Sequence, residues 1–213
     1  RNKLINGEKD ARNIDYLPMI KKYFPSSKVI WVYRDPRDVV LSKMKAAWSS
    51  KRPVWFHALV GNFQLENGLN NSRDSNVFLL KYENVLSDFR GNIQAMCKFI
   101  DVDYEDKMEH FQNSAKNLIL NRRELQYKSN NFKALMPGNS QKWKQELSPG
   151  TIYLIQKLDR VSFDYLGYTK DENLEVSQFH KIIVRLLTLV RPLARILYNN
   201  IIIYSKSNNA IRT

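Results

Sequence analysis

An arginine and a serine eight residues apart, Arg34 and Ser42, could together hold an anion. Arg34 ends an unbroken apolar run over residues 29–33, and Ser42 lies about two turns into the segment that follows. A guanidinium donates hydrogen bonds in a planar fork that suits phosphate oxygens, and a hydroxyl can donate one more. The alternative is that Arg34 only pairs with a carboxylate such as Asp38. The spacing therefore predicts an anion site, with an internal ion pair as the alternative.

The elements around this pair predict how it is positioned. Residues 29–33 show no polar alternation and are mostly β-branched or aromatic, which favours a strand covered on both faces of an α/β sheet. Asp35 offers an N-cap oxygen, and Pro36 suits the first turn of a helix over 36–48. Ligands of open α/β sheets bind outside the carboxyl ends of the strands, where helix amides also favour anions. We therefore expect Arg34 to face a ligand crevice.

The remaining elements are predicted from apolar spacing and from cap residues. Asp15 and Ser148 are expected to cap the helices that they precede, and Gly167 to end the second of these. The predicted helices cover 15–24, 53–70, 89–100, 103–116 and 149–167, a second buried strand covers 76–81, and a polar, basic loop covers 117–140.

Composition indicates an anionic partner. The 213 residues suffice for one α/β domain, and 34 Lys and Arg against 21 Asp and Glu give a net charge of +13. Nucleic acid, an acidic membrane and a bis-phosphate nucleotide all fit this charge. The one cysteine, Cys97, allows no internal disulfide, which favours a reducing, cytoplasmic location. The chain begins with Arg1, so an anchor that precedes it, and with it the Golgi lumen, stays open as the alternative.

Residues 177–213 are predicted to form a basic amphipathic helical tail behind a domain over 1–176. Pro192 is expected to kink or split this helix. The tail is expected either to contact an acidic membrane surface peripherally, through residues 179–204, or to pack on the domain or on a partner subunit. Its apolar face comprises Ile182, Ile183, Leu186, Leu187, Val190, Leu193, Ile196 and Leu197, and its polar, cationic stripe comprises Lys181, Arg185, Thr188, Arg191, Arg195 and Asn199.

Four blocks of sequence resemble the sulfotransferases, which use 3′-phosphoadenosine 5′-phosphosulfate as sulfuryl donor. R-D-P-R-D-V-V-L-S at 34–42 resembles the family's 3′-phosphate motif. Residues 7–25, 79–84 and 141–149 resemble the segment upstream of it, the strand that ends in Y-E-D and the late W-x-x-x-L-S-P segment. The blocks follow the family's order and span about residues 7 to 168.

The resemblance implies an α/β fold of three layers, P-loop-like, with a central parallel sheet flanked by helices. No Gly/Ser/Thr-rich phosphosulfate loop precedes Arg34, so the N-terminal strand and that loop are expected to be missing from this chain. The chain is then the C-terminal two-thirds of a sulfotransferase. It is nearer the bacterial and tyrosylprotein-type members than the cytosolic small-molecule ones, because Ala11 stands where the latter have a histidine base.

The resemblance also implies roles for single residues. Arg34 and Ser42 would hold the 3′-phosphate, and Tyr82 would lie against the adenine, the alternative being a tyrosine that anchors the strand end. Gly138 is the one residue left of the R-K-G that cytosolic members have before the late tryptophan. The second cation of the phosphate site would come from Lys142 or from one of three other residues, Arg122, Arg123 and Lys133.

Lys9 is the candidate that would stabilise charge on the bridging oxygen of the donor, the alternative being a surface lysine beside Glu8. Glu8 is the local substitute for a base, which would otherwise lie upstream of this chain. No metal is expected, because sulfuryl transfer does not demand one, and because His57, His110, His180 and Cys97 lack ligand spacing. The acidic residues in 101–106 lack the glycine and the terminal glutamate of a calcium loop.

The predicted function is therefore sulfuryl transfer to a hydroxyl or amine of a glycan, a peptide or a small molecule. The basic charge points to an acidic acceptor such as a glycan. The alternatives are a truncated, non-catalytic relative and a basic module that binds nucleic acid or a membrane surface. No nucleic-acid partner is expected, because no such motif and no interleaving of aromatic and basic residues is present. The oligomeric state stays open.

Overall fold

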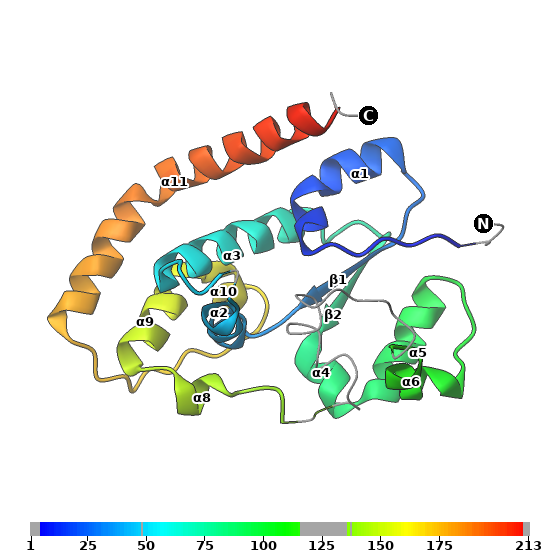
Figure 1. The fold of residues 1–213 in the computed structure, drawn as a ribbon, viewed down its shortest axis with the longest axis horizontal. Coiled ribbons are helices and arrows are strands. Elements are labelled where there is room, and N and C mark those ends of the chain that lie inside the picture. Colours follow the sequence, from blue (N-terminus) through cyan, green and yellow to red (C-terminus); the bar gives the residue numbers. More distant parts are fainter. Residues whose placement is uncertain (1–4, 48, 116–135, 137, 211–213) are drawn as a thin grey trace.

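Two parallel strands lie among helices in the computed structural model, which describes residues 5–47, 49–115, 136 and 138–210. Strand β1 (Val29–Tyr33) pairs with β2 (Val77–Lys81) in a register that runs from Val29 opposite Val77 to Tyr33 opposite Lys81. Both predicted strands are confirmed. The chain is thus mixed α/β, mostly helical, with a small parallel sheet (Figure 1).

The sheet is covered less completely than the unbroken apolar run predicts. Trp31 is buried against α3 (Val54–Leu69), where a Cβ at Gly68 would lie 2.6 Å from the Trp31 ring, so only glycine allows this approach. Val32 is 54% exposed, and Leu79 is also exposed. The prediction of cover on both faces is therefore wrong within the described residues, because apolar run length reports β propensity more directly than cover.

The helix after β1 begins as predicted at Pro36 but ends at Lys45 rather than at residue 48. The Asp35 side chain accepts a hydrogen bond from the Arg37 amide and caps α2 (Pro36–Lys45), whose first residue is proline. Val40 and Leu41 of α2 pack against Leu59 and Phe63 of α3 in the main apolar core. The same core includes residues of α8 (Trp143–Glu146), α9 (Pro149–Leu158) and the C-terminal helix.

The N-terminal helix starts earlier than predicted. The Asp10 side chain caps a 3-10 helix, η1 (Ala11–Tyr16), which continues into α1 (Leu17–Tyr23). Asp15, the predicted cap, instead accepts hydrogen bonds from Asn67 at 2.8 Å and from the Tyr198 hydroxyl at 2.8 Å. That prediction is wrong because a half-buried tertiary network takes up the carboxylate.

The structure adds a helix that the sequence does not predict, directly after β2, and it has a 3-10 helix followed by a short α-helix in place of the single helix predicted over 103–116. Short helix α4 (Tyr82–Ser87) follows β2 directly, and α5 (Phe89–Phe99), η2 (Asp106–His110) and α6 (Phe111–Ala115) come next. Ser148 caps α9, as predicted. The predicted single helix over 149–167 breaks at Asp159, whose side chain caps α10 (Arg160–Asp164). Most of the predicted loop over 117–140 lies outside the described residues.

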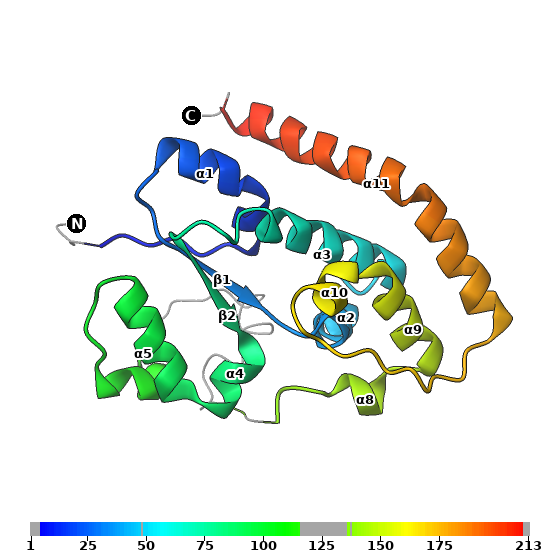
Figure 2. The ribbon, with the colours of Figure 1, turned by 180° about the vertical axis from the view of Figure 1, so that it is seen from behind.

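The C-terminal helix α11 (Gln178–Ala210) runs unbroken through Pro192 and bends around α9 and α3 (Figures 1 and 2). Val184 is buried against the main core, with Leu187 and Tyr198 beside it. None of the described helices combines the length and the hydropathy needed to cross a membrane. The division of the chain at residue 176 stays a prediction.

Candidate functional site

Arg34 and Tyr82 lie together at the carboxyl ends of the two strands. Each follows the last residue of its strand, and those last residues, Tyr33 and Lys81, are opposite each other in the sheet. The Arg34 guanidinium carbon lies 4.6 Å from the centre of the Tyr82 ring. The parallel register therefore places a cation and an aromatic ring where ligands of such sheets bind.

Asn139 closes this cluster from a distant part of the chain. Its backbone carbonyl accepts a hydrogen bond from Arg34 Nη2, and its side-chain amide donates to the Tyr82 hydroxyl at 2.8 Å. Gly138 precedes it and is exposed, and a Cβ there would meet nothing within 4 Å. The chain just before the 141–149 segment thus contacts the cluster through Asn139, a residue that the sequence did not single out.

One donor of Arg34 is left over. Its Nε atom is buried and has no hydrogen-bond partner among the described residues, although the side chain as a whole is 21% exposed. Arg34 Nη2 lies 3.7 Å from Asp38 Oδ2, so the predicted alternative, an internal ion pair, is present. This ion pair is long, and Asp38 is shared with other donors. Its carboxylate accepts shorter hydrogen bonds from the amides of Gln141 at 2.7 Å and Trp143 at 3.1 Å.

Asp38 also shows where Ser42 lies. Residues four apart share one face of a helix, so Ser42 is on the face of α2 that Asp38 presents to residues 141–143. Lys45, three residues further, pairs with Glu146 on the same late segment. Ser42 is exposed on this face. The structure therefore places Arg34 and Ser42 on the same side of α2, although no direct contact joins them within the described residues.

The second arginine of the motif, Arg37, has a structural environment. It is 3% exposed, and its guanidinium donates to both Asp35 oxygens at 2.9 and 2.7 Å and to Gln156 at 3.0 Å. The guanidinium also lies 3.7 Å from the centre of the Trp143 ring. Sequence reasoning missed this role. The acid–base spacing in R-D-P-R-D was the available signal, because a charged residue in the first turn of a buried helix needs a partner.

Glu83, in the first turn of α4, fixes the start of the motif. It accepts hydrogen bonds from the Asp35 amide at 3.0 Å and from the Tyr168 hydroxyl at 2.8 Å. Burial, and then the Glu83 carboxylate, raise the pKa of Tyr168, so its hydroxyl stays a neutral donor. A cavity of about 250 Å³ borders these groups, with Lys81 and Lys144 among its lining residues. This region is also one that sequence reasoning did not find.

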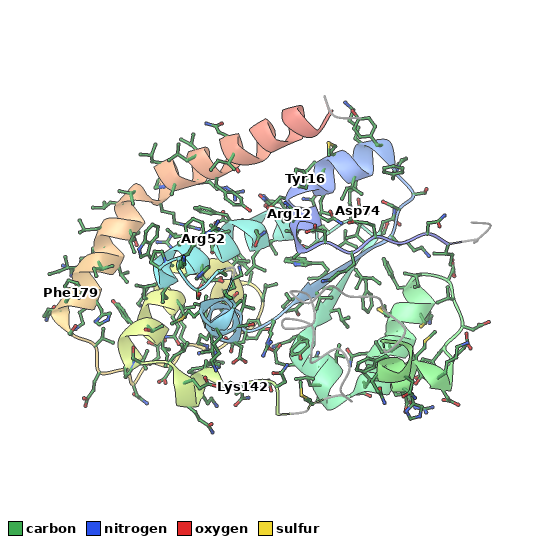
Figure 3. All side chains as sticks on the ribbon, in the orientation of Figure 1. Arg12, Tyr16, Arg52, Asp74, Lys142 and Phe179 are labelled. Atoms are coloured by element: carbon green, nitrogen blue, oxygen red, sulfur yellow. The ribbon has the colours of Figure 1, made fainter. Side chains whose placement is uncertain are left out.

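The other predicted site residues lie apart from the cluster. Lys142 is exposed at the start of α8, at the lower edge of the molecule in Figure 3. Glu8 and Lys9 are exposed in the N-terminal segment, where Glu8 accepts a hydrogen bond from Asn13. Within the described residues no contact joins Lys142, Glu8 or Lys9 to Arg34. The further cation candidates, Arg122, Arg123 and Lys133, lie outside the described residues.

The charge of Lys9 acts on its neighbour. The pKa of Asp10 is lowered chiefly by its hydrogen bond from the Arg12 side chain, and in smaller part by the charge of Lys9. Asp10 in turn caps η1. The N-terminal segment thus has an ordered polar arrangement of its own.

Metal ligands do not gather in the described ranges, where no group of three His, Cys, Asp or Glu residues could hold an ion. His57 is buried, with Nε2 3.2 Å from the Ser49 carbonyl. Burial, and then the charge of Lys43, lower the pKa of His57. His57 is therefore a neutral residue of the core rather than a ligand or base in the cluster.

Comparison with known proteins identifies related sequences. Residues 1–106 match the model of the sulfotransferase family. The chain is 30% identical over 176 residues to a 3-alpha-hydroxysteroid sulfotransferase of Cavia porcellus, an alignment that covers 68% of this chain and 61% of that protein. The chain thus spans less than two thirds of the length of this curated relative. The family match contains Glu8, Lys9, Arg34, Ser42 and Tyr82.

Proposed function

Because residues 1–106 match the sulfotransferase family and the curated relative is itself a sulfotransferase, we place the chain in this family and propose that it binds 3′-phosphoadenosine 5′-phosphosulfate. In this proposal the cluster of Arg34, Tyr82 and Asn139 holds the adenosine 3′-phosphate end of the donor. We further propose that β1 and β2 belong to the central parallel sheet of a three-layer, P-loop-like fold.

The observation that carries the proposal is the Nε donor of Arg34, which has no partner among the residues that the structure describes. A buried guanidinium nitrogen without a partner is costly, and an anion can satisfy it. The guanidinium stands directly before α2, whose N-terminal amides add a favourable potential for negative charge. A phosphate oxygen therefore suits this position by charge and by hydrogen bonding.

The neighbouring groups fit the rest of a nucleotide phosphate end. The Tyr82 ring, beside Arg34, offers a face on which a base could stack, a contact worth on the order of 1–3 kcal/mol. Ser42 offers a hydroxyl on the face of α2 that carries Asp38. The open space at Gly138 leaves room beside Asn139, and Lys142 offers a further cation if the late segment moves toward the site.

Sulfuryl transfer itself needs groups beyond this cluster. The acceptor oxygen attacks sulfur, the bond from sulfur to the 5′-phosphate oxygen breaks, and the acceptor proton goes to a base. In the proposal Lys9 stabilises the negative charge on the departing oxygen, which a point cation can do by charge alone. Glu8 is the local candidate for the base. The net charge of +13 supports an acidic acceptor such as a glycan, and the lone buried Cys97 supports a reducing, cytoplasmic location.

Binding of adenosine 3′,5′-bisphosphate tests the proposal. Isothermal titration of the full chain is expected to show saturable binding, and Arg34→Ala is expected to weaken it roughly 10- to 100-fold through loss of charge-assisted hydrogen bonds. Ser42→Ala is expected to weaken it by less, about fivefold to tenfold, because a neutral hydroxyl is the weaker donor.

The matched control is Arg73→Ala. Arg73 is exposed just before β2, at the amino end of the sheet, so the same change of charge occurs on the opposite edge. Its affinity for the nucleotide should equal that of the wild type. Equal loss in Arg73→Ala and Arg34→Ala would mean that the surface charge binds the nucleotide without a site. No saturable binding by the wild type would overturn the proposal for this chain.

A further inference from the structure

The side of α11 that faces away from the domain is apolar along most of its described length. Leu189, at 76%, is the most exposed of its large apolar side chains. We call this surface the outer seam of α11, and it comprises Phe179, Ile182, Leu186, Leu189, Val190, Leu193, Ile196, Leu197 and Ile201. With each side chain at least half exposed, the seam amounts to on the order of 900 Å², above the roughly 300–600 Å² of the largest patch on a typical monomer.

The opposite side of α11 fixes this orientation. Arg191 pairs with Glu66 of α3, and Arg195 donates to the Phe63 carbonyl at 3.0 Å. Val184 is buried in the main core. Turning the helix to hide the outer seam would break these contacts and bring both arginines to the outside, so the apolar exposure follows from the docking itself.

This arrangement corrects the picture drawn from the sequence. The predicted cationic stripe contains Arg191 and Arg195, which point toward the domain instead of solvent. The predicted apolar face divides into inner residues such as Leu187 and outer residues such as Leu186. A 3.6-residue period identifies the stripes of a helix but not which stripe the domain will bind.

The outer seam has the spacing of a coiled-coil contact. Its central positions are separated by steps of three, four, three, four and three residues, which is the alternation of a and d positions in a heptad. Those positions are Phe179, Ile182, Leu186, Leu189, Leu193 and Ile196. Val190 and Leu197 flank the line and widen it. A helix of the same pattern is the natural partner of such a line.

Charge decides between the two surfaces that an apolar helix face can meet. Residues 178–201 contain no Asp or Glu, and of their four Lys and Arg only Lys181 and Arg185 are exposed, both toward the start of the helix. An acidic membrane attracts an interfacial helix through cations that flank the apolar face, and here two of the four are turned inward. Two copies of this seam, by contrast, meet without like charges along most of its length.

We propose that the outer seam of α11 binds the same seam on a second copy of the chain. Self-complementary contact about a two-fold axis is the commonest form of protein oligomer. The exposed area is close to the roughly 800 Å² that each partner contributes to a standard interface. The helix α11 bends with its convex side away from the domain (Figure 1), and Leu189, the most exposed side chain of the seam, and Leu193, the next residue of the a and d line, lie at its middle. Phe179 lies at the outer edge of the molecule in Figure 3.

Analytical ultracentrifugation of the full chain over a range of concentrations tests this proposal. The wild type is expected to sediment as a dimer of the 25.1 kDa chain, and the double variant Leu189→Glu/Leu193→Glu as a monomer with an unchanged circular dichroism spectrum. The matched control is Tyr165→Glu, which places the same charge on a side chain that is 69% exposed elsewhere, and which should remain a dimer.

Two further measurements keep the outcome decisive. If the double variant does not fold, Leu189→Cys is oxidised instead, and a disulfide-linked dimer is expected for it but not for Tyr165→Cys. A wild type that stays monomeric, or a Leu189→Cys variant that does not cross-link, overturns the proposal. A monomeric wild type that sediments with phosphatidylserine-containing vesicles, in a manner lost in the double variant, would assign the seam to a membrane.

Discussion

The arginines at the start of α2 and those on α11 meet carboxylates in different surroundings. Arg37 and Asp35 are both almost fully buried, and Gln156 and the Trp143 ring complete the shell around Arg37. Arg191 and Glu66 keep 18% and 30% of their side chains exposed. The first pair is a fixed internal support for the motif, whereas the second is a partly hydrated contact between helices.

This difference decides what each region leaves free. At α2, Arg37 pairs with Asp35, whereas the neighbouring Arg34, beside Tyr82, keeps one donor that has no partner in the described part of the chain. At α11, Arg191 and Arg195 are turned toward the domain, and the outer seam itself carries no charge. The same residue type thus lines the proposed anion site in one region and leaves an apolar surface in the other.

The largest loss of stability is expected when the buried pair of Arg37 and Asp35 is removed. Arg37→Leu is expected to lower the free energy of unfolding by about 3–5 kcal/mol, because it leaves the Asp35 carboxylate buried without its partner. Arg34→Leu, one turn away, is expected to cost about 1 kcal/mol, because Asp38 keeps its two backbone hydrogen bonds. Denaturant unfolding followed by circular dichroism measures both.

The two variants should separate stability from binding. Arg34→Leu should keep its fold and lose affinity for adenosine 3′,5′-bisphosphate. Arg37→Leu should lose stability first, and any folded fraction should still bind. Equal destabilisation by both substitutions would show that Arg34 is as much a part of the internal support as Arg37.

The strand β1, the cap of α2 and the position of Arg34 could be predicted from the sequence, because each depends on local residue types. Asp35 caps α2 and Ser148 caps α9 through short side-chain contacts that the sequence displays directly. It was insufficient for Asp15 and for Arg191, whose partners lie 52 and 125 residues away in the chain. Asn139 is a similar case, since nothing in its own neighbourhood signals contact with Tyr82.

The pKa of Asp159, at the break between α9 and α10, depends on burial and on carboxylates of both regions, Asp35 and Glu66. Burial, and to a smaller extent the charges of Asp35 and Glu66, raise the pKa of Asp159 to about 6, against hydrogen bonds from Ser162 that lower it. The folded state therefore holds a proton that the unfolded state, with a pKa of 3.8, releases. Stability from this group is present at low pH and is lost as pH rises from about 4 to about 6.

Asp159→Asn is expected to remove this loss while its side-chain oxygen still caps Ser162. The difference in unfolding free energy between wild type and variant should change by up to about 3 kcal/mol between pH 4 and pH 7. The positive charge of Lys43 interacts with Asp159 and makes this pH-dependent change smaller. Urea unfolding at a series of pH values measures this difference. The control is Asp164→Asn, at an exposed position, for which we expect no such change. A flat difference would mean that Asp159 is ionised in both states.

Weakening the α11 contact should have the smallest effect. Glu66→Gln keeps the shape of the side chain and the hydrogen bond from Asn62, but it removes the charge that faces Arg191 and Arg195. Because this contact is partly hydrated, the expected loss is about 1–2 kcal/mol.

Amide hydrogen exchange should locate this loss in α11 rather than across the protein, since Val184 and Leu187 still pack on the core. The control Glu105→Gln removes an exposed ion pair with Lys107 and should change nothing measurable. Faster exchange at the start of α2 as well as in α11 would show that the two regions unfold together. Exchange confined to α11 would show that the support of the anion site is independent of the helix that carries the outer seam.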